Sequence, residues 1–485
     1  MERLGDRAGR AYLILLASAF LLAAPFGASG GGYSGITSFK ALLYAVPTLL
    51  FLLSALPKLP LRALLRSPWR LCAAGYLLWS LLSALCSPWK RAAFLGAARQ
   101  EGFCILALYV LSFLPLSVRR VRTRALLPVF ALSILLLDGY CLLQLSGHDP
   151  LGLYPAGLGW QDANIRYPGS YLGTIGNAGL TCAVLGAASA LFFRAILLRG
   201  GKRWLLLPVL LLSLRVIALA DVSAPVVGFA AAALLALACC EGSLPALCRW
   251  FSLSAFCLPM LLGLRIPVRI LFPMLLLAWV FYVLSRSLPA LPQRRSVPPL
   301  LALALLLFAA GFLFRYDGYE LALRDASGLL HGTVSDDMGS GRIYIWRQVL
   351  AAVPGHLWLG TGPDTLALRG LQPYVWVSEA AGITVRSEIS AAHNEILQTL
   401  VCQGLPAALL HLSLFVCALV QFVRQRGCAA GVCAAGAVCY AAQAMFGISA
   451  AASAPLFWVL LALSLNPEFQ GGPSHGTASV TLCEH

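Results

Sequence analysis

The sequence has few charged residues for its length. Only 11% of its 485 residues are Asp, Glu, Lys or Arg, whereas a soluble domain has about 25%. Hydrophobic residues make up 60% of the chain, and the mean hydropathy is +0.82. This balance excludes an ordinary soluble globular protein. It predicts a chain that crosses a membrane many times, because each spanning helix needs about 20 mostly apolar residues.

Acidic residues are especially scarce, with 19 Asp and Glu against 35 Lys and Arg, which gives a net charge of +16. In a soluble protein such a charge would suggest a nucleic-acid partner. No stretch combines basic residues with the aromatic residues that stack on bases, so we expect no nucleic-acid partner. No Asp-x-Asp pair in a predicted outer loop compels a metal site, and we expect neither a metal nor a cofactor.

Cysteine is absent from the long connection between Arg315 and His393, although the chain has 15 cysteines. Almost all of them lie in apolar segments, where cysteine serves as a small packing residue. This distribution argues against a disulfide framework and against a cysteine zinc site.

Long apolar segments are what the sequence has in abundance. We find about 14 of them, which predicts an all-α polytopic integral membrane protein with about 12–14 transmembrane helices and a large, partly helical extracytoplasmic loop. The segments centre near residues 19, 47, 79, 110, 136, 185, 211, 231, 255, 277, 306, 413, 438 and 460. The first follows a basic N-terminus, and we interpret it as an uncleaved helix, not a signal peptide.

Most Lys and Arg residues lie in one alternate set of loops, which the positive-inside rule places in the cytoplasm. Both termini are then cytoplasmic, and the two longer connections lie outside. We therefore expect four parts: transmembrane helices in 1–315, with a short outer loop near 147–172; an extracytoplasmic loop in 316–392; transmembrane helices in 393–466; and a disordered cytoplasmic tail in 467–485.

A helix is predicted in the long outer loop, from a cap at Ser340 to Pro354. It has an apolar stripe made by Ile343, Trp346, Val349, Leu350 and Val353. Arg342 lies on this stripe and points toward protein or membrane. Its guanidinium suits a phosphate, because the planar fork gives two charge-assisted hydrogen bonds. The alternatives are lipid head groups or a local carboxylate, Asp336 or Asp337. Asp364 is a candidate cap for the next short helix.

The shorter outer connection contains one basic residue, Arg166, before a glycine-rich helix start that includes Asn177. A helix start offers free N–H groups to an anion, so Arg166 is either part of an anion site or an interfacial anchor. Asp138 and Arg215 lie inside apolar segments, where charge is costly. Glu101 follows Arg99 and is interpreted as its partner in a surface pair of little energetic weight.

His393 begins the last apolar region. If it starts a helix, Ile396, Leu397 and Leu400 share its face, and a histidine on such a face is more often a buried packing group than a catalyst. The other candidates are weaker by position. They are His331 and His356 in the long loop, His148 beside Asp149, and His411 in an apolar segment, where a packing role is expected.

Four segments resemble the O-antigen ligase and O-antigen polymerase superfamily of bacterial membrane glycosyltransferases. They are "SPWKRAAFLGAARQEGFCILALYVL", "RYPGSYLGTIGNAGLTCAVLGAASAL", "GSGRIYIWRQVLAAVPGHLWLGTGPDTL" and "AHNEILQTLVCQGLPAALL". They match the family's Arg-x-Glu-Gly, Arg…Gly-x-x-Gly-Asn, Gly-Arg-x-x-x-Trp and His-Asn…Gly patterns in order, over roughly residues 75–425. One departure is that Ser223 is followed by Ala224, where the family often has an arginine.

The resemblance implies glycan transfer from a polyprenyl-diphosphate lipid to an acceptor hydroxyl, or to a second lipid-linked glycan, at the outer face of the bacterial cytoplasmic membrane, with inversion at the anomeric carbon. His393 would be the general base, with a pKa near its ordinary value. Arg166 and Arg342 would hold the diphosphate, and Arg215 would be a weaker third. Further substrate contacts are expected from Asn177, Trp346 and Asn394.

Two other functions stay open. A lipid-linked glycan flippase or transporter would have charged residues along a midplane cavity, and only Asp138 and Arg215 lie deep in segments. A non-catalytic relative that binds the glycan lipid would explain the missing arginine after Ser223. The sequence does not decide between a ligase and a polymerase.

Overall fold

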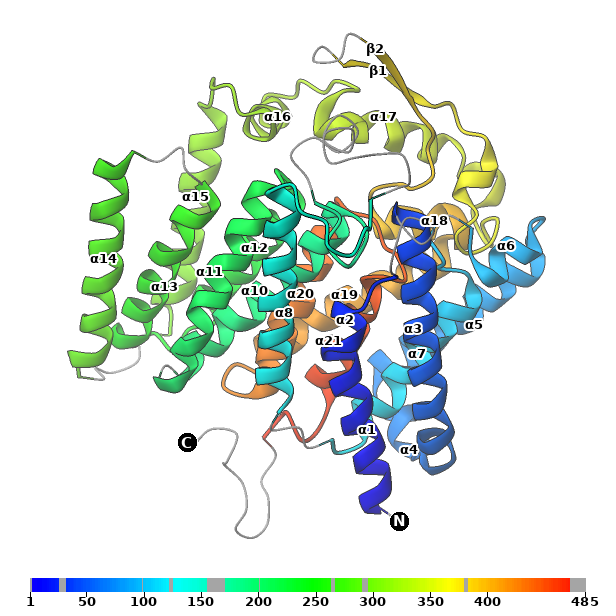
Figure 1. The fold of residues 1–485 in the computed structure, drawn as a ribbon, viewed down its shortest axis with the longest axis horizontal. Coiled ribbons are helices and arrows are strands. Elements are labelled where there is room, and N and C mark those ends of the chain that lie inside the picture. The colour runs from blue at the N-terminus through cyan, green and yellow to red at the C-terminus, as the bar shows by residue number, and fades with distance from the viewer. Residues whose placement is uncertain are drawn as a thin grey trace.

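The computed structural model describes residues 2–25, 32–97, 99–121, 125–154, 171–199, 201–262, 267–289, 295–378 and 383–471. These residues are mostly helical (Figure 1). The N-terminal half has α1 (Glu2–Ala17), α2 (Ala19–Leu22), α3 (Gly32–Ala55), α4 (Leu61–Leu65), α5 (Pro68–Cys86), α6 (Lys90–Leu95), α7 (Phe103–Val118), α8 (Leu126–Leu145), α10 (Ala178–Arg199), α11 (Leu207–Leu219) and α12 (Ser223–Ala238). The C-terminal half has α13 (Leu244–Leu262), α14 (Val268–Ser287), α15 (Val297–Phe314), α16 (Leu321–Leu330), α17 (Met338–Ala351), α18 (Glu395–Gln403), α19 (Leu405–Arg424), α20 (Ala429–Ala444) and α21 (Ala454–Leu465).

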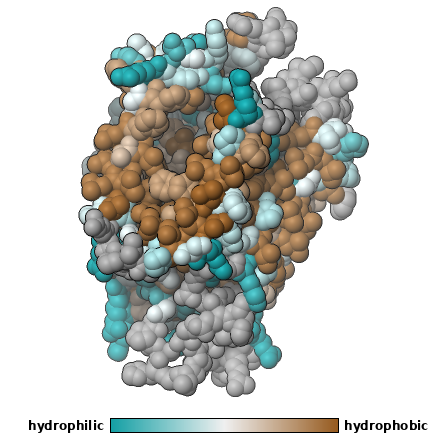
Figure 2. All heavy atoms as spheres, turned by 90° about the vertical axis from the view of Figure 1, so that its left-hand side faces the viewer, coloured by the Kyte–Doolittle hydropathy of each residue, from teal (hydrophilic) through white to brown (hydrophobic). Residues whose placement is uncertain are grey.

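Every predicted apolar segment is centred on a helix. Within the described ranges, eight helices are long and apolar enough to cross a membrane, and four shorter apolar helices accompany them, namely α7, α12, α20 and α21. Figure 2 shows one face of the molecule with apolar side chains across its middle and hydrophilic ones toward its upper and lower ends. The prediction of an all-α polytopic membrane protein is confirmed.

The packing of the helices separates a protein core from a lipid-facing edge. The spanning part of α10 is wholly buried, and α11, α12 and α20 pack around it. The pair α14 and α15 lies at one edge of the bundle (Figure 1) and exposes most of its apolar side chains. Such exposure suits lipid as the neighbour, since a large contiguous apolar surface is typical of contact with a membrane.

The connection between α15 and α18 is partly helical, as predicted, and it lies across the end of the bundle opposite to the start of α1 (Figure 1). It contains α16, α17 and an antiparallel hairpin of β1 (Tyr374–Ser378) and β2 (Ile383–Ser387), in which Tyr374 is opposite Ser387. The hairpin was not predicted. Its signal was present, because both strands are rich in β-branched and aromatic residues. That this end faces outward stays a prediction.

The last described helix ends at the other end of the bundle. The side-chain amide of Asn466, next after α21, donates hydrogen bonds to the carbonyl oxygens of Leu116 at 2.6 Å and Arg119 at 2.7 Å. These carbonyls lie at the C-terminal end of α7, away from the α15–α18 connection. The beginning of α1 and the end of α21 therefore lie on the same end of the bundle (Figure 1). The side of the membrane that holds them stays a prediction.

Part of the α15–α18 connection is built into the bundle. This part, the 357–364 turn, lies between α5 and α18. The indole N–H of Trp79 donates to the carbonyl of Trp358 at 3.0 Å, and the backbone N–H groups of Thr361 and Gly362 donate to the carbonyl of Cys402 at 2.9 and 2.7 Å. Gly404 separates α18 from α19 with a positive φ of 86°, which glycine adopts without cost.

We expect Gly404→Ala to destabilise the fold by about 3 kcal/mol. A Cβ at this position would overlap the carbonyl oxygen of Trp358, and the backbone there is left-handed. Gly355→Ala is the matched control, because a Cβ there meets nothing within 4 Å. Thermal unfolding of the purified variants measures the difference. Equal unfolding temperatures for the two variants would disprove the close approach of the 357–364 turn to Gly404.

Candidate functional site

His393 lies immediately outside α18, in a strained turn. Its φ is +49°, a value uncommon for a residue with a side chain. Asn394 follows as the N-cap, and its Oδ1 accepts a hydrogen bond from the backbone N–H of Leu397 at 2.9 Å. The expected helix starts at Glu395, so His393 is placed beside the helix end and does not share its apolar face. Strain of this kind is often kept at functional sites.

Arg342 lies in α17, directly after three consecutive residues with positive φ, Gly339, Ser340 and Gly341. The predicted Ser340 cap is therefore wrong, because a left-handed Ser340 does not cap the helix. The Nε of Arg342 donates to the carbonyl of Phe446 at 3.0 Å, and its Nη1 donates to the carbonyl of Gly339. Two glycines that tolerate positive φ thus direct this guanidinium onto the α20–α21 connection.

The local carboxylates considered as partners for Arg342 have other partners. Asp336 forms an ion pair with Arg347 at 2.7 Å, and Asp337 accepts a hydrogen bond from the Tyr374 hydroxyl at 2.9 Å. Within the described residues, Arg342 contacts carbonyl oxygens and no carboxylate. Its positive charge is therefore available to an anion.

Trp346 joins α17 to the residues just before His393. Its indole N–H donates to the carbonyl of Ala392 at 2.9 Å, and its ring centroid lies 6.3 Å from that of Phe446. Arg342 donates to the same Phe446. The connection between α20 and α21 is thus where α17 and the segment before His393 meet. Of the predicted stripe, Val349 and Val353 are buried as expected, whereas Leu350 is exposed.

The electrostatic surroundings of His393 disfavour its protonated form. Burial is the main cause, and the nearby positive charges of Arg342 and Arg99 add to it, so that the pKa of His393 is lowered to about 4. The expected pKa near the ordinary value is therefore wrong for the unliganded protein. Burial also lowers the pKa of Arg342.

Three other predicted binding residues are Arg166, Arg215 and Asn177. Arg166 lies outside the described residues. Arg215 lies on α11, which packs against α8, α10 and α13. Asn177 caps the start of α10, where its Oδ1 accepts from the backbone N–H of Leu180 at 3.2 Å. Arg342 and His393, with Trp346 and Asn394 beside them, are the part of the prediction that the structure brings together.

A buried ion pair near this site was missed. Arg99 and Glu101 were interpreted as a surface pair, but only 4% and 8% of their surfaces are exposed. The guanidinium of Arg99 binds Asp364 instead, with an Nη2–Oδ1 distance of 2.8 Å. Asp364 also accepts from the backbone N–H of Ala97 at 2.8 Å. Its predicted capping role is wrong, because Thr365 is the N-cap of the next short helix, Leu366–Arg369.

Two further buried carboxyls, Glu101 and Glu395, line a cavity of about 40 Å³ at the base of α18. Burial raises the pKa of Glu101 to about 7 and that of Glu395 to about 8. Sequence reasoning did not single out Glu395. Its available signal was an acidic residue directly after the His-Asn pair, in a chain with few acids.

Other polar residues inside the bundle have structural partners. Asp138 is fully buried, and its Oδ2 accepts a hydrogen bond from the Ser213 hydroxyl at 2.7 Å. This hydrogen bond partly offsets the cost of burying the carboxyl. The predicted packing role of His411 is confirmed, since its Nδ1 lies 2.9 Å from the Thr399 hydroxyl. In the ranges that the structure describes, no three or more His, Cys, Asp and Glu residues form a group suited to a metal ion.

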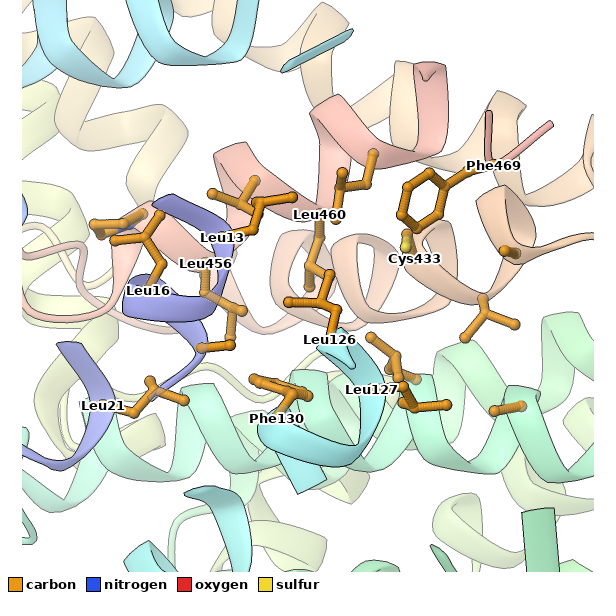
Figure 3. A pocket seen from close by; sticks show the side chains of 18 of the residues that line it. Leu13, Leu16, Leu21, Leu126, Leu127, Phe130, Cys433, Leu456, Leu460 and Phe469 are labelled. Carbon is orange, nitrogen blue, oxygen red and sulfur yellow. The ribbon is translucent and has the colours of Figure 1, made fainter. Parts of the chain in front are cut away.

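A larger cavity lies elsewhere. It has a volume of about 140 Å³ and an almost wholly apolar lining from α1, α2, α8, α10, α20 and α21. Figure 3 shows leucines of α1, α8 and α21 turned toward it, with Phe130 and Phe469. It contains no group suited to acid–base chemistry, so the smaller polar region around His393 is the better functional candidate.

These features define a polytopic membrane protein with a basic, histidine-containing site at one end of its helical bundle. Residues 250–412 match the family model described as O-antigen ligase. The matched region includes Arg342, Trp346 and His393, and it confirms the resemblance found in the motifs. No curated protein sequence matches the chain.

The family supports a glycosyltransferase-like enzyme of cell-envelope or O-antigen biosynthesis, with a lipid-linked glycan and an acceptor as substrates. Together with the apolar helices, it supports a multi-pass protein of the bacterial inner membrane.

Proposed function

We propose that the protein transfers a glycan from a polyprenyl-diphosphate lipid to an acceptor hydroxyl at the outer face of the cytoplasmic membrane. The observation that carries the proposal is the gathering of Arg342 and His393 beside the α20–α21 connection. Trp346, one turn after Arg342 on α17, donates to the carbonyl of Ala392, the residue before His393, and the charge of Arg342 contributes to the lowered pKa of His393. A cation that has no carboxylate partner among the described residues, next to a neutral imidazole, suits a reaction that needs both an anion ligand and a base.

Arg342 holds the diphosphate in this proposal. The leaving diphosphate gains negative charge as the glycosidic bond breaks, and a guanidinium already fixed in place stabilises that charge without reorganisation. The Phe446 and Gly339 carbonyls fix the guanidinium. Arg166 and Arg215 are proposed as additional diphosphate ligands, and Arg215 compensates for the alanine at position 224.

His393 takes the proton of the acceptor hydroxyl as the oxygen attacks the anomeric carbon from the side opposite the diphosphate. At neutral pH its imidazole is unprotonated, as a base must be. A diphosphate bound at Arg342 offsets the positive charge that lowers the pKa of His393, so donor binding makes the imidazole a stronger base. Trp346 and Asn394 hold His393 through the residues on either side of it.

Release of polyprenyl diphosphate tests the proposal. Purified protein, incubated with a labelled polyprenyl-diphosphate glycan and an acceptor glycan, is expected to release polyprenyl diphosphate and to form a glycosidic product. Donor binding without release would favour the non-catalytic relative, which the missing arginine after Ser223 suggests. Movement of intact donor across a vesicle membrane would favour the transporter.

Arg342→Lys is expected to weaken donor binding by about 10-fold to 100-fold, since a lysine keeps the charge and loses the paired hydrogen bonds of the fork. The control is Arg347→Lys on the same helix, where the arginine is exposed and paired with Asp336. Titration of labelled donor into detergent-solubilised protein measures both. Equal affinities for the two variants would remove Arg342 from the donor site.

The pH dependence is expected to differ between the free and donor-bound enzyme. Because the unliganded pKa of His393 is about 4, the acid limb of kcat/KM lies near that pH. Bound diphosphate raises the pKa, so the acid limb of kcat lies at higher pH. Initial rates at several donor concentrations and pH values separate the two limbs. If both limbs fall at the same pH, the donor does not act on the base in this way.

A further inference from the structure

A pair of buried carboxyls lies next to the proposed site and has no role in the mechanism above. Glu101 precedes α7 and Glu395 begins α18, so two segments distant in the sequence supply them. Their side chains belong to residues only 8% and 6% exposed. They line the same cavity, whose volume of about 40 Å³ is enough for a few water molecules.

Each carboxyl is held by one oxygen. The Oε1 of Glu101 accepts from the Ser449 hydroxyl at 2.7 Å and from the Tyr109 hydroxyl at 3.2 Å, and the Oε1 of Glu395 accepts from the Tyr440 hydroxyl at 3.0 Å. Among the described residues, neither Oε2 accepts a hydrogen bond. Each carboxyl therefore has one oxygen left for a water molecule or a proton of the cavity.

The charges around the cavity favour a proton on this pair. The titratable or charged groups that line the cavity with Glu395 come from α5 and α7 (Tyr76, Tyr109), the α6–α7 connection (Arg99, Glu101), the 357–364 turn (Asp364) and the C-terminal helices (Cys402, His411, Tyr440). Arg99 is their one permanent cation, and it is already paired with Asp364. Two ionised carboxylates here would be uncompensated. Burial, followed by the charge of Glu101, accordingly raises the pKa of Glu395 to about 8.

The cavity wall reaches the residues beside His393. Gln398 lines the cavity, and its Oε1 accepts a hydrogen bond from the backbone N–H of Ala392 at 2.8 Å, one residue before His393. Arg99 also lines the cavity, and its charge acts on His393 and on Glu101 alike. Gln398 thus links the cavity wall to the backbone directly before His393.

We propose that Glu101 and Glu395 share one proton at rest and accept, through the cavity, the proton that His393 takes from the acceptor hydroxyl. This inference rests on the proposed function. As the acceptor oxygen bonds to the anomeric carbon, the bond from that carbon to the diphosphate oxygen breaks, and its electron pair stays on the diphosphate. The hydroxyl proton passes to His393 and then to the ionised carboxylate of the pair. Loss of this proton to water restores the resting state.

The direction of transfer follows from the charges. An imidazolium beside Arg342 and Arg99 is unfavourable, whereas a second proton on the carboxyl pair neutralises it. The pair therefore returns His393 to its neutral form, ready for the next acceptor. It acts through His393 and touches neither substrate.

Glu101→Gln, Glu395→Gln and the double variant test the relay in the full-length protein, because glutamine keeps the shape and the hydrogen-bond acceptor and removes the titration. We expect turnover to fall by about tenfold or more and to lose its dependence on pH between about 6 and 8, with donor binding and unfolding temperature kept. Glu388→Gln is the control, since Glu388 is 71% exposed. Release of polyprenyl diphosphate is the readout.

Rates and pH profiles equal to those of Glu388→Gln would overturn the relay and leave the proposed function intact. Wild-type protein that binds donor without releasing the diphosphate would overturn the proposed function, and the relay step with it. Infrared spectra give a second readout that needs no turnover. Wild type is expected to show a protonated-carboxyl band near neutral pH that is missing in Glu395→Gln, and its absence from wild type would refute the shared proton even if the variants do not fold.

Discussion

His393→Ala is expected to lower turnover by about 10²-fold to 10⁴-fold, the usual contribution of a positioned general base. In the proposed mechanism the acceptor hydroxyl then has no group to take its proton, while Arg342, the proposed diphosphate ligand, is untouched. Donor affinity should therefore stay within about threefold of wild type, since small differences in binding are common for a neighbouring truncation. Release of labelled polyprenyl diphosphate and direct titration of donor measure the two quantities separately.

His356→Ala is the matched control for this experiment. His356 lies in the same α15–α18 connection but at its exposed surface, after α17. We expect wild-type turnover from this variant. A His393→Ala protein that transfers glycan at the wild-type rate would exclude His393 as the base, whereas loss of donor binding together with turnover would give it a structural role instead.

Asp364→Asn is expected to destabilise the protein by about 3–5 kcal/mol, because it leaves the buried Arg99 guanidinium without its counter-charge. Asp364 is 4% exposed and Arg99 is equally buried, so water cannot take the place of the carboxylate. The same carboxylate also accepts a hydrogen bond from the backbone N–H of Ala97, so one substitution is expected to loosen the α6–α7 connection and the 357–364 turn together. Thermal unfolding in detergent or nanodiscs measures the loss.

Asp336→Asn provides the comparison, since it breaks an ion pair with Arg347 in which both side chains are largely open to solvent. A surface pair of this kind contributes about 0–1 kcal/mol. If the two variants unfold at the same temperature, the Arg99–Asp364 ion pair does not stabilise the fold as a buried pair should.

The helices were predictable because their signal is local. An apolar run long enough to cross a bilayer identifies itself without knowledge of its neighbours, and each expected centre lies in a helix. The α17 helix was also found from its local period. The hairpin was not predicted, although Tyr374–Ser378 and Ile383–Ser387 have the composition of strands. Two short strands give a much weaker sequence signal than the long apolar segments on either side of them.

The sequence singles out a candidate site residue only where that residue stands out locally. Arg342 and His393 do so, as a lone arginine on an apolar stripe and a lone histidine before a helix, and the family motifs include both; their roles stay predictions. The partner of Arg99 was not predictable, because Asp364 lies 265 residues away and local spacing suggested Glu101. The pKa of His393 was likewise out of reach, since it depends on charges brought near only by folding.

The break at Gly404 also limits how the molecule can open. The carbonyl of Cys402, which a continuous helix would pair internally, is taken by Thr361 and Gly362 of the 357–364 turn. If that turn moved away, the Cys402 carbonyl and the Thr361 and Gly362 N–H groups would lose their hydrogen-bond partners in apolar surroundings. An unpaired backbone group costs several kcal/mol there. We therefore expect the 357–364 turn to stay in place when substrates bind. We therefore expect movements that admit a substrate to involve α16, α17 and the hairpin, which lie across this end of the bundle (Figure 1).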